Sequence, residues 1–206
     1  MTDKTIGELL REKLDATKQI AQNMTRLEEI NKERIELQKQ FACVLLERLL
    51  IVDPDVVVAG GAPRDWDNDR QAKDLDIYIQ GKEYESTWSV AHRANRVLST
   101  LGFSVSRQES SDYDYLGQNG IAAVYDLKEV MVPAQLIICS VSQNKVIDMF
   151  DCSTSKIWMS PYGYVHKSPE YTVGKKYKTY FLKEETKHEY KERMRNKFPN
   201  YKEVIV

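Results

Sequence analysis

Residues 60–65 read Gly-Gly-Ala-Pro-Arg-Asp, and residues 74–79 read Asp-Leu-Asp-Ile-Tyr-Ile. Three consecutive valines come before the first stretch, between a proline and the glycines, which predicts a short buried strand over residues 55–59. The apolar positions of the second stretch predict another strand over residues 75–79. Two glycines directly after a strand let the backbone turn sharply and approach a ligand closely. We therefore expect a turn that faces a ligand between two buried strands.

The glycine turn has the composition of a phosphate-binding loop. The backbone amides of Gly60 and Gly61 can point at phosphate oxygens, and Arg64 adds a planar cationic fork that matches phosphate. The simpler alternative is a tight turn into a helix, with Arg64 and Asp65 as a surface ion pair. This stretch by itself leaves both alternatives open.

Asp74 and Asp76 are two residues apart on the second predicted strand. Positions two apart in a strand face the same side, so the two carboxylates lie together while Leu75 faces the core. Neighbouring carboxylates repel each other, and a divalent cation relieves that repulsion. Because oxygen ligands favour Mg²⁺ or Mn²⁺, we expect one of these ions here. The alternatives are a strand end that carries two solvated acids, or an Asp that caps a helix.

Residues 5–50 are predicted to be helical. They contain no proline and no glycine after Gly7, and they are rich in residues that lose little rotamer freedom in a helix. Four apolar residues at spacings of three and four lie along one face: Ile20, Met24, Leu27 and Ile30. This pattern is typical of a two-helix hairpin packed on the body, or of a short coiled coil that makes a homodimer.

The rest of the chain alternates between apolar and polar segments. The patterns predict a helix over 84–101, strands over 121–125, 134–139 and 146–150, and a terminal helix over 183–197. Residues 144–145 would turn the chain between the last two strands, and residues 60–73 and 104–120 are expected as loops. This order of elements predicts an α+β fold.

The composition excludes several classes of protein. The chain has 206 residues, with 30 Lys and Arg against 31 Asp and Glu, so any basic surface must be a local patch. Its three cysteines form no Cys-x-x-Cys pair, which argues against a disulfide framework or a zinc ribbon. No apolar run is long enough for a signal peptide or a membrane span, so we expect a soluble cytoplasmic protein without a membrane partner.

We divide the chain into a helical extension (1–39), a core (40–160) and a Tyr- and Lys-rich C-terminal segment (161–206). Within the last part, residues 175–197 carry nine Lys or Arg against four Glu, a net charge of +5. Tyrosines are interleaved with these cations, and tyrosines can stack on unpaired bases while lysines follow the backbone. The segment is therefore a candidate RNA-binding surface, and the alternative is a solvated helix beside a tyrosine-rich sheet.

Together, the glycine turn and the Asp-x-Asp strand resemble the polymerase-β-type nucleotidyltransferase superfamily, and most closely the head domain of tRNA CCA-adding enzymes and bacterial poly(A) polymerases. The chain is also similar to short bacteriophage nucleotidyltransferases. That similarity lies in residues 60–66, in Lys-Asp-x-Asp-Ile at 73–77, in an apolar strand with Gln135, in Phe150-Asp151 and in Lys-Phe-Pro at 197–199. The resemblance covers roughly residues 41–200.

The resemblance implies a mixed sheet flanked by helices and a two-metal transfer of a nucleoside monophosphate from a nucleoside triphosphate (NTP) to a hydroxyl. Asp74 and Asp76 would hold two Mg²⁺ or Mn²⁺ ions. The turn, with Gly60, Gly61, Arg64 and Asp65, would bind the nucleotide. The acceptor that the nearest branches imply is RNA, such as a tRNA 3′ end, and a protein or small-molecule acceptor stays open.

The chain departs from the family at the third carboxylate. Gln135 stands where many members have an acid, and an amide cannot act as a base. Three acids could substitute, and Asp151 is preferred to Asp126 and Asp148 because its surroundings loosely resemble a nucleotide-positioning segment of CCA-adding enzymes. Lys156, five residues after Asp151, could contact a phosphate.

Gln135 also favours an alternative function, in which a catalytically degenerate fold serves as a nucleotide-, RNA- or protein-binding module. A third hypothesis is a structural or assembly protein that oligomerises through the N-terminal helix.

Overall fold

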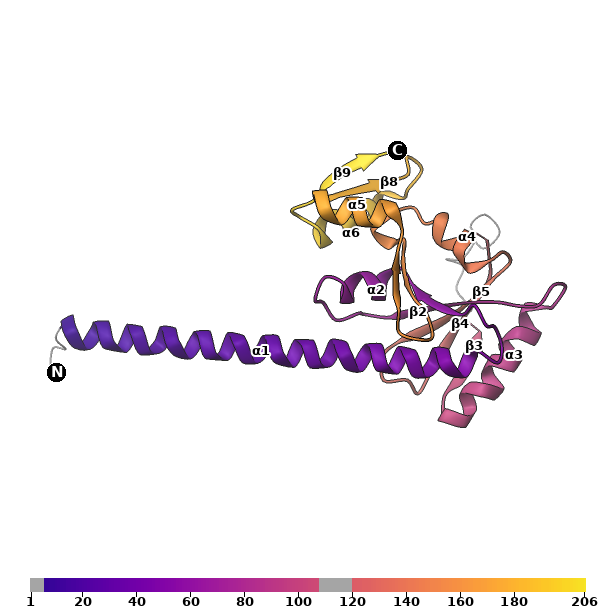
Figure 1. Cartoon of the computed structure of the whole chain (residues 1–206), viewed down its shortest axis with the longest axis horizontal. Coiled ribbons are helices and arrows are strands. Elements are labelled where there is room, and N and C mark those ends of the chain that lie inside the picture. Colours follow the sequence, from indigo (N-terminus) through magenta and orange to yellow (C-terminus); the bar gives the residue numbers. More distant parts are fainter. Residues whose placement is uncertain (1–5, 108–119) are drawn as a thin grey trace.

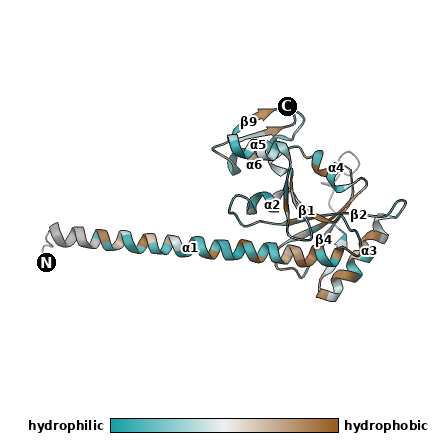
Figure 2. Cartoon of the chain, in the orientation of Figure 1, coloured by the Kyte–Doolittle hydropathy of each residue, from teal (hydrophilic) through white to brown (hydrophobic). Residues whose placement is uncertain are grey.

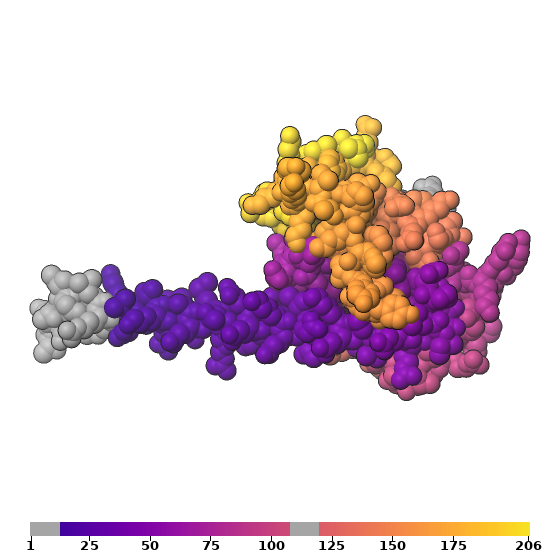
Figure 3. Space-filling model, in the orientation of Figure 1, coloured from indigo at the N-terminus to yellow at the C-terminus, as the bar shows by residue number. Residues whose placement is uncertain are grey.

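The computed structural model describes residues 6–107 and 120–206, with side chains from residue 13 onward. A single helix, α1 (Ile6–Leu49), reaches far out of an α+β body as a straight rod (Figure 1). The space-filling view shows the outer half of this rod with no other part of the described chain against the visible face (Figure 3). The two-helix hairpin is therefore wrong, because α1 is continuous through the segment where the hairpin would have turned.

The body is built on a mixed sheet. In the described residues it has seven strands in the order β3-β4-β5-β2-β1-β6-β7. The strands are β1 (Val57–Ala59), β2 (Leu75–Gln80), β3 (Ser104–Arg107), β4 (Ile121–Lys128), β5 (Ala134–Cys139), β6 (Ile157–Met159) and β7 (Val165–Lys167). Neighbouring strands are antiparallel except β2 and β5, which run parallel in the centre.

Helices cover the sheet unequally. The other helices are α2 (Gly61–Trp66), α3 (Thr87–Leu98), α4 (Gln143–Asp148), α5 (Pro169–Tyr177) and α6 (His188–Lys197), with 3-10 turns η1 (Ser99–Leu101) and η3 (Ser153–Ser155). The last part of α1 and the helix α3 pack on one face in the main core, whereas α4 packs on part of the other face. Figure 2 shows hydrophobic residues of α1 gathered where it crosses the body.

Strand β2 shows how the sequence divides the two faces. Leu75, Ile77 and Ile79 are fully buried against α1 and α3, because alternate residues of a strand point to the same side. Asp76 and Tyr78 point to the opposite face, where the smaller core beside α4 leaves the sheet partly open. The predicted alternation is confirmed, and it places a carboxylate on the open face.

The outer half of α1 carries the predicted apolar face but packs on nothing described. Ile20, Met24 and Leu27 are 58–65% exposed, whereas Leu45 and Leu49 further along the same helix are fully buried. The intramolecular packing expected for residues 20–30 is therefore wrong. None of the helices in the described part of the chain is both long and apolar enough to cross a membrane.

Several predicted elements need correction. The strand expected over 146–150 is the helix α4, and the turn expected at 144–145 lies inside it, because Gln143, Val146 and Ile147 are buried at helical spacing. The loop expected over 60–73 begins with α2, and the terminal helix begins at His188 rather than at 183. Part of the expected loop at 104–120 is the strand β3, and residues 108–119 lie outside the described residues.

The last part of the chain, from β8 to β9, forms a small layer of its own. Strands β8 (Thr179–Leu182) and β9 (Lys202–Ile205) are parallel and are connected through α6. The fully or almost fully buried Tyr180, Leu182 and Met194 make a third core cluster between them. This layer brings α6 back toward the open face of the main sheet, above α2 and away from α1 (Figure 1).

Candidate active site

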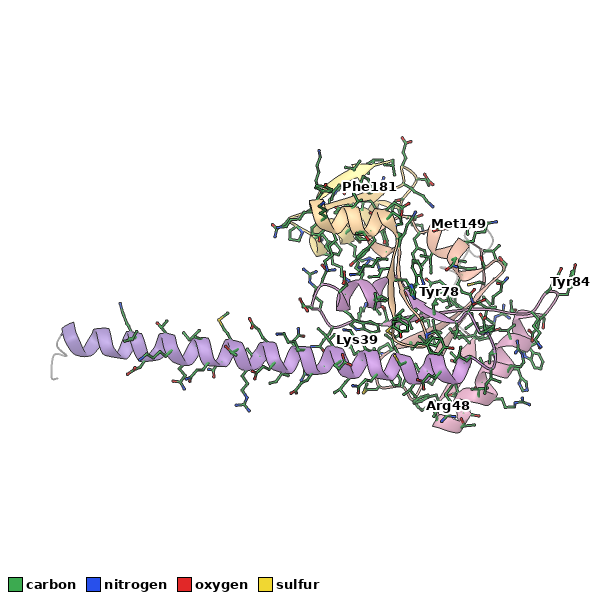
Figure 4. All side chains as sticks on the ribbon, in the orientation of Figure 1. Lys39, Arg48, Tyr78, Tyr84, Met149 and Phe181 are labelled. Atoms are coloured by element: carbon green, nitrogen blue, oxygen red, sulfur yellow. The ribbon has the colours of Figure 1, made fainter. Side chains whose placement is uncertain are left out.

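A pocket of about 460 Å³ opens on the face of the sheet that α1 and α3 leave free. Its walls come from the β1–α2 turn, the start of β2, the end of α4 with the loop that follows, η3 and α6. Tyr78 and Met149, which both line it, lie on the side of the sheet away from α1 (Figure 4). The structure brings together residues that are more than 130 positions apart in the sequence, as Asp65 and Lys197 are.

Asp74 and Asp76 both line this pocket, as the alternation predicted. Burial and, to a smaller extent, the neighbouring charge of Asp74 raise the pKa of Asp76 to about 7, although the charges of Arg64 and Arg193 act in the opposite direction. A bound cation would offset the cost of ionising Asp76 and lower its pKa. The described residues contain no cluster of three or more His, Cys, Asp or Glu, so the oxygen donors from this pair would need completion by a substrate or water.

Gly60 has a left-handed backbone (φ 80°), which glycine adopts without strain. Its amide donates to the carbonyl of Ile157 at 2.9 Å, so this amide already has a partner in β6 and does not face a phosphate as expected. Gly61 begins α2 and lies beside the acids, since a Cβ added there would be 4.0 Å from Asp74 Oδ1. The turn therefore places bare backbone next to the carboxylate pair.

Arg64 and Asp65 form a buried pair rather than the surface pair considered above. Their exposed fractions are 7% and 6%, and Arg64 Nε donates to Asp65 Oδ1 at 3.2 Å. Arg64 Nη1 also donates to Ser155 Oγ at 3.1 Å, while Asp65 Oδ2 accepts from Lys197 Nζ at 2.6 Å. A buried arginine with carboxylate and hydroxyl partners fixes the turn against η3 and α6.

The helix α2 is held to α1 by a second set of contacts. The indole nitrogen of Trp66 donates to the side-chain oxygen of Gln38 at 3.0 Å, and the amide of Ala72 donates to the same oxygen at 2.8 Å. Gln38 in turn donates to the carbonyl of Ala72. These buried hydrogen bonds fix both ends of the segment between the glycine turn and β2.

Of the remaining predicted residues, one lines the pocket and two lie outside it. Asp151 lines the pocket, 3.5 Å from Lys183. Lys156 does not belong to the pocket lining and lies 3.9 Å from Glu170, so the structure does not bring it to the carboxylate pair. Asp148 is exposed at the end of α4.

Gln135 faces Asp76 across the parallel β2–β5 pair and Asp126 across the antiparallel β4–β5 pair. Its amide nitrogen donates to Asp126 Oδ1 at 3.4 Å, and Gln135 lines the pocket whereas Asp126 does not. Gln135 therefore lies in register between Asp76 and Asp126, and its amide separates the two acids.

Sequence reasoning missed the apolar half of the pocket and the wall formed by α6. Phe150 and Met149, at the end of α4, face Tyr78 of β2, and the rings of Tyr78 and Phe150 are 5.7 Å apart. Tyr190 and Arg193 come from α6. The spacing of Tyr190, Arg193 and Lys197 by three and four was visible in the sequence, but nothing local indicated what that face would cover.

The fold combines a central mixed sheet with a glycine turn after its first strand and two aspartates at the start of the next, Asp74 directly before β2 and Asp76 within it. Similar solved structures include a tRNA-processing enzyme in an apo form, with a TM-score of 0.52 and 14% identity over 69% of this chain and 36% of that one. A CCA-adding enzyme in complex with CTP (TM-score 0.52, 14% identity, 71% and 34% covered) is also similar. So is the Thermotoga maritima CCA-adding enzyme complexed with tRNA (TM-score 0.52, 14% identity, 71% and 32% covered).

These likenesses confirm the expected α+β fold, and at 14% identity they concern the fold alone. The chain spans about a third of the length of these enzymes. No protein-family model and no curated protein sequence matches it.

Proposed function

We propose that this protein is a nucleotidyltransferase that depends on a divalent metal and moves a nucleoside monophosphate from an NTP to a hydroxyl. The observation that supports it best is the placement of Asp74 and Asp76 beside the bare backbone of Gly61, on the open face of a nucleotidyltransferase-like sheet. In the reaction, the acceptor hydroxyl loses its proton to solvent and its oxygen bonds to the α-phosphorus. The bond between the α-phosphorus and the oxygen that bridges to the β-phosphorus breaks, and pyrophosphate leaves with that oxygen.

Asp74 and Asp76 would hold Mg²⁺ or Mn²⁺. The donor set fits such an ion because it consists of carboxylate oxygens, and because Asp76 has a raised pKa that a cation would lower. When bound, the metal would lower the pKa of the attacking hydroxyl and stabilise the leaving pyrophosphate. The chain itself positions the substrate: Arg64 and Asp65 keep the turn rigid, and the apolar half with Tyr78 and Phe150 suits a base.

We propose RNA as the acceptor. Three tyrosines of the C-terminal segment, Tyr162, Tyr164 and Tyr177, are 64–74% exposed, and Lys176 lies 5.2 Å from the ring of Tyr177. Exposed aromatic rings beside lysines suit unpaired bases and their backbone. Tyr171 and Tyr180 are 1–2% exposed, so they belong to the core instead.

The direct test is incubation of the protein with each labelled NTP, Mg²⁺ and total bacterial RNA, beside an Asp74→Ala/Asp76→Ala variant. We expect label in RNA with the intact protein and none with the variant. Label in RNA with both proteins would refute the role of the carboxylate pair. Label in the protein itself would replace RNA with a protein acceptor.

A second candidate function is a binding module that retains the fold without the chemistry. Gln135 supports it, because an amide lies in register with Asp76 where many related enzymes have an acid. A module of this kind would bind nucleotide or RNA equally well with and without Mg²⁺. Tight binding in EDTA without any transfer would favour it over the enzyme.

We further propose that the exposed apolar face of α1 pairs with the same face of a second copy. Ile20, Met24 and Leu27 are exposed on the outer half of α1, which nothing described covers, and helices in proteins gain most of their stability from packing an apolar face. Phage origin and cytoplasmic location stay predictions from the sequence.

A further inference from the structure

The helix α6 forms one wall of the pocket. Tyr190, Arg193 and Lys197 are spaced by three and four residues, so they share one face of α6, and all three line the pocket that holds Asp74 and Asp76. The opposite face of the helix contacts β9 instead of the pocket, since Arg195 forms an ion pair with Glu203 at 2.7 Å. The C-terminal segment therefore contributes directly to the candidate active site.

Two contacts fix α6 to the rest of the pocket, one to the helix α2 that follows the glycine turn and one to η3. Lys197 Nζ donates to Asp65 Oδ2 at 2.6 Å, and the hydroxyls of Tyr190 and Ser155 are 3.1 Å apart. Ser155 also accepts from Arg64, so one network joins α6, η3 and the glycine turn. Because Tyr190 and Lys197 hold the helix near both of its ends, the backbone of the residues between them has a defined position in the pocket wall.

Arg193 is the residue between these two anchors. Its side chain is exposed, and within the described residues it forms no ion pair, whereas Arg64 and Lys197 already share Asp65. The guanidinium lies over the Tyr190 ring, 4.7 Å from its centre, which is a cation–π contact. A planar guanidinium can donate two hydrogen bonds to one phosphate group.

We propose that Arg193 binds the polyphosphate of the NTP from the α6 wall of the pocket, so that α6 makes the pocket selective for triphosphates over monophosphates. This inference rests on the proposed function. The carboxylates that would hold the metal come from the sheet side of the pocket and the guanidinium comes from α6, an arrangement that suits a metal-bound anion with several phosphate groups. A nucleoside monophosphate lacks the phosphates that would reach Arg193.

The test is titration calorimetry of the full chain with ATP, CTP, GTP and UTP, and with the corresponding monophosphates, in Mg²⁺. We expect Arg193→Ala to weaken binding of the preferred NTP about 10-fold or more, the worth of one charge-assisted phosphate contact. Binding of the monophosphate should stay within about 2-fold. Arg193→Lys should recover only part of the loss, since lysine cannot form the planar bidentate contact.

Arg195→Ala is the matched control, because it removes the same side chain from the other face of the same helix. It should leave both affinities within about 2-fold. Equal NTP affinity for Arg193→Ala and the intact chain would overturn the inference, and equal weakening of NTP and monophosphate would do the same. If the intact chain binds no nucleotide, both this inference and the proposed function are refuted. Bound NTP without any transfer counts against the proposed function alone.

Discussion

Asp76 combines a functional position with an unfavourable environment. Its burial and the nearby charge of Asp74 raise its pKa to about 7, so the fold itself gains nothing from this carboxylate near neutral pH. We expect Asp76→Asn to reduce transfer at least about 100-fold, because a metal ligand is lost. The variant should remain folded, because the amide has the same shape and carries no charge. Initial rates with labelled NTP and urea unfolding followed by circular dichroism measure the two effects.

Asp148→Asn is the control for this substitution. Asp148 is an exposed aspartate at the end of α4, outside the pocket lining, and its loss should change neither rate nor stability. Full activity of Asp76→Asn would remove the metal-based proposal, whereas loss of activity together with loss of folded structure would show a structural role.

The carboxylate of Glu85 fixes the start of the helix α3 through hydrogen bonds. Glu85 accepts two hydrogen bonds from Arg93, one from Ser89 Oγ and one from the amide of Lys82. The Arg93 contact is the main reason that the pKa of Glu85 falls to about 2. A carboxyl with a depressed pKa stabilises the fold above its unfolded pKa, and this contribution is lost as the pH falls from about 4.5 to about 2.

We therefore expect Glu85→Gln to lower the free energy of unfolding by about 1–2 kcal/mol at pH 7, through loss of charge-assisted hydrogen bonds. The difference from the unmodified chain should shrink as the pH falls below about 4.5 and vanish near pH 2. Urea unfolding at a series of pH values measures it, with the exposed Glu83→Gln as control. A difference that does not vary with pH would contradict the charge-based explanation.

At the scale of elements, the sequence predicted what depends on local pattern. The prediction of the strand β2 was correct, because alternation over six residues decides which side chains share a face. The strand expected over 146–150 was wrong because a short apolar run fits a strand or a buried helix equally well, and tertiary packing selected the helix α4.

Only the part of the candidate site that comes from one short stretch of sequence could be predicted. The glycine turn and the carboxylate pair lie close together in the sequence, and the structure brings them together. The wall formed by α6 depends on contacts such as Lys197 with Asp65, across 132 positions, and no local pattern encodes such a contact. The parallel pairing of β8 with β9, which positions α6, was missed for the same reason.

At the scale of the whole molecule, the outer half of α1 is the feature that the body does not explain. Its exposed residues Ile20, Met24 and Leu27 continue an apolar face that is buried further along the helix. Residues 13–26 carry a net charge of +2 and residues 28–36 a net charge of −2. An antiparallel pairing of two copies would therefore bring opposite charges together, whereas a parallel pairing would align like charges.

We expect the full chain to sediment as a dimer at micromolar concentration and Met24→Glu/Leu27→Glu to sediment as a monomer, because the charges would have to be buried in the seam. Gln22→Glu, on the opposite face of α1, should remain dimeric. Since Met24 and Leu27 contact no described part of the body, neither variant should change the thermal stability of the body or its nucleotide affinity. A monomeric full chain, or a dimer that survives the double substitution, would refute pairing through α1.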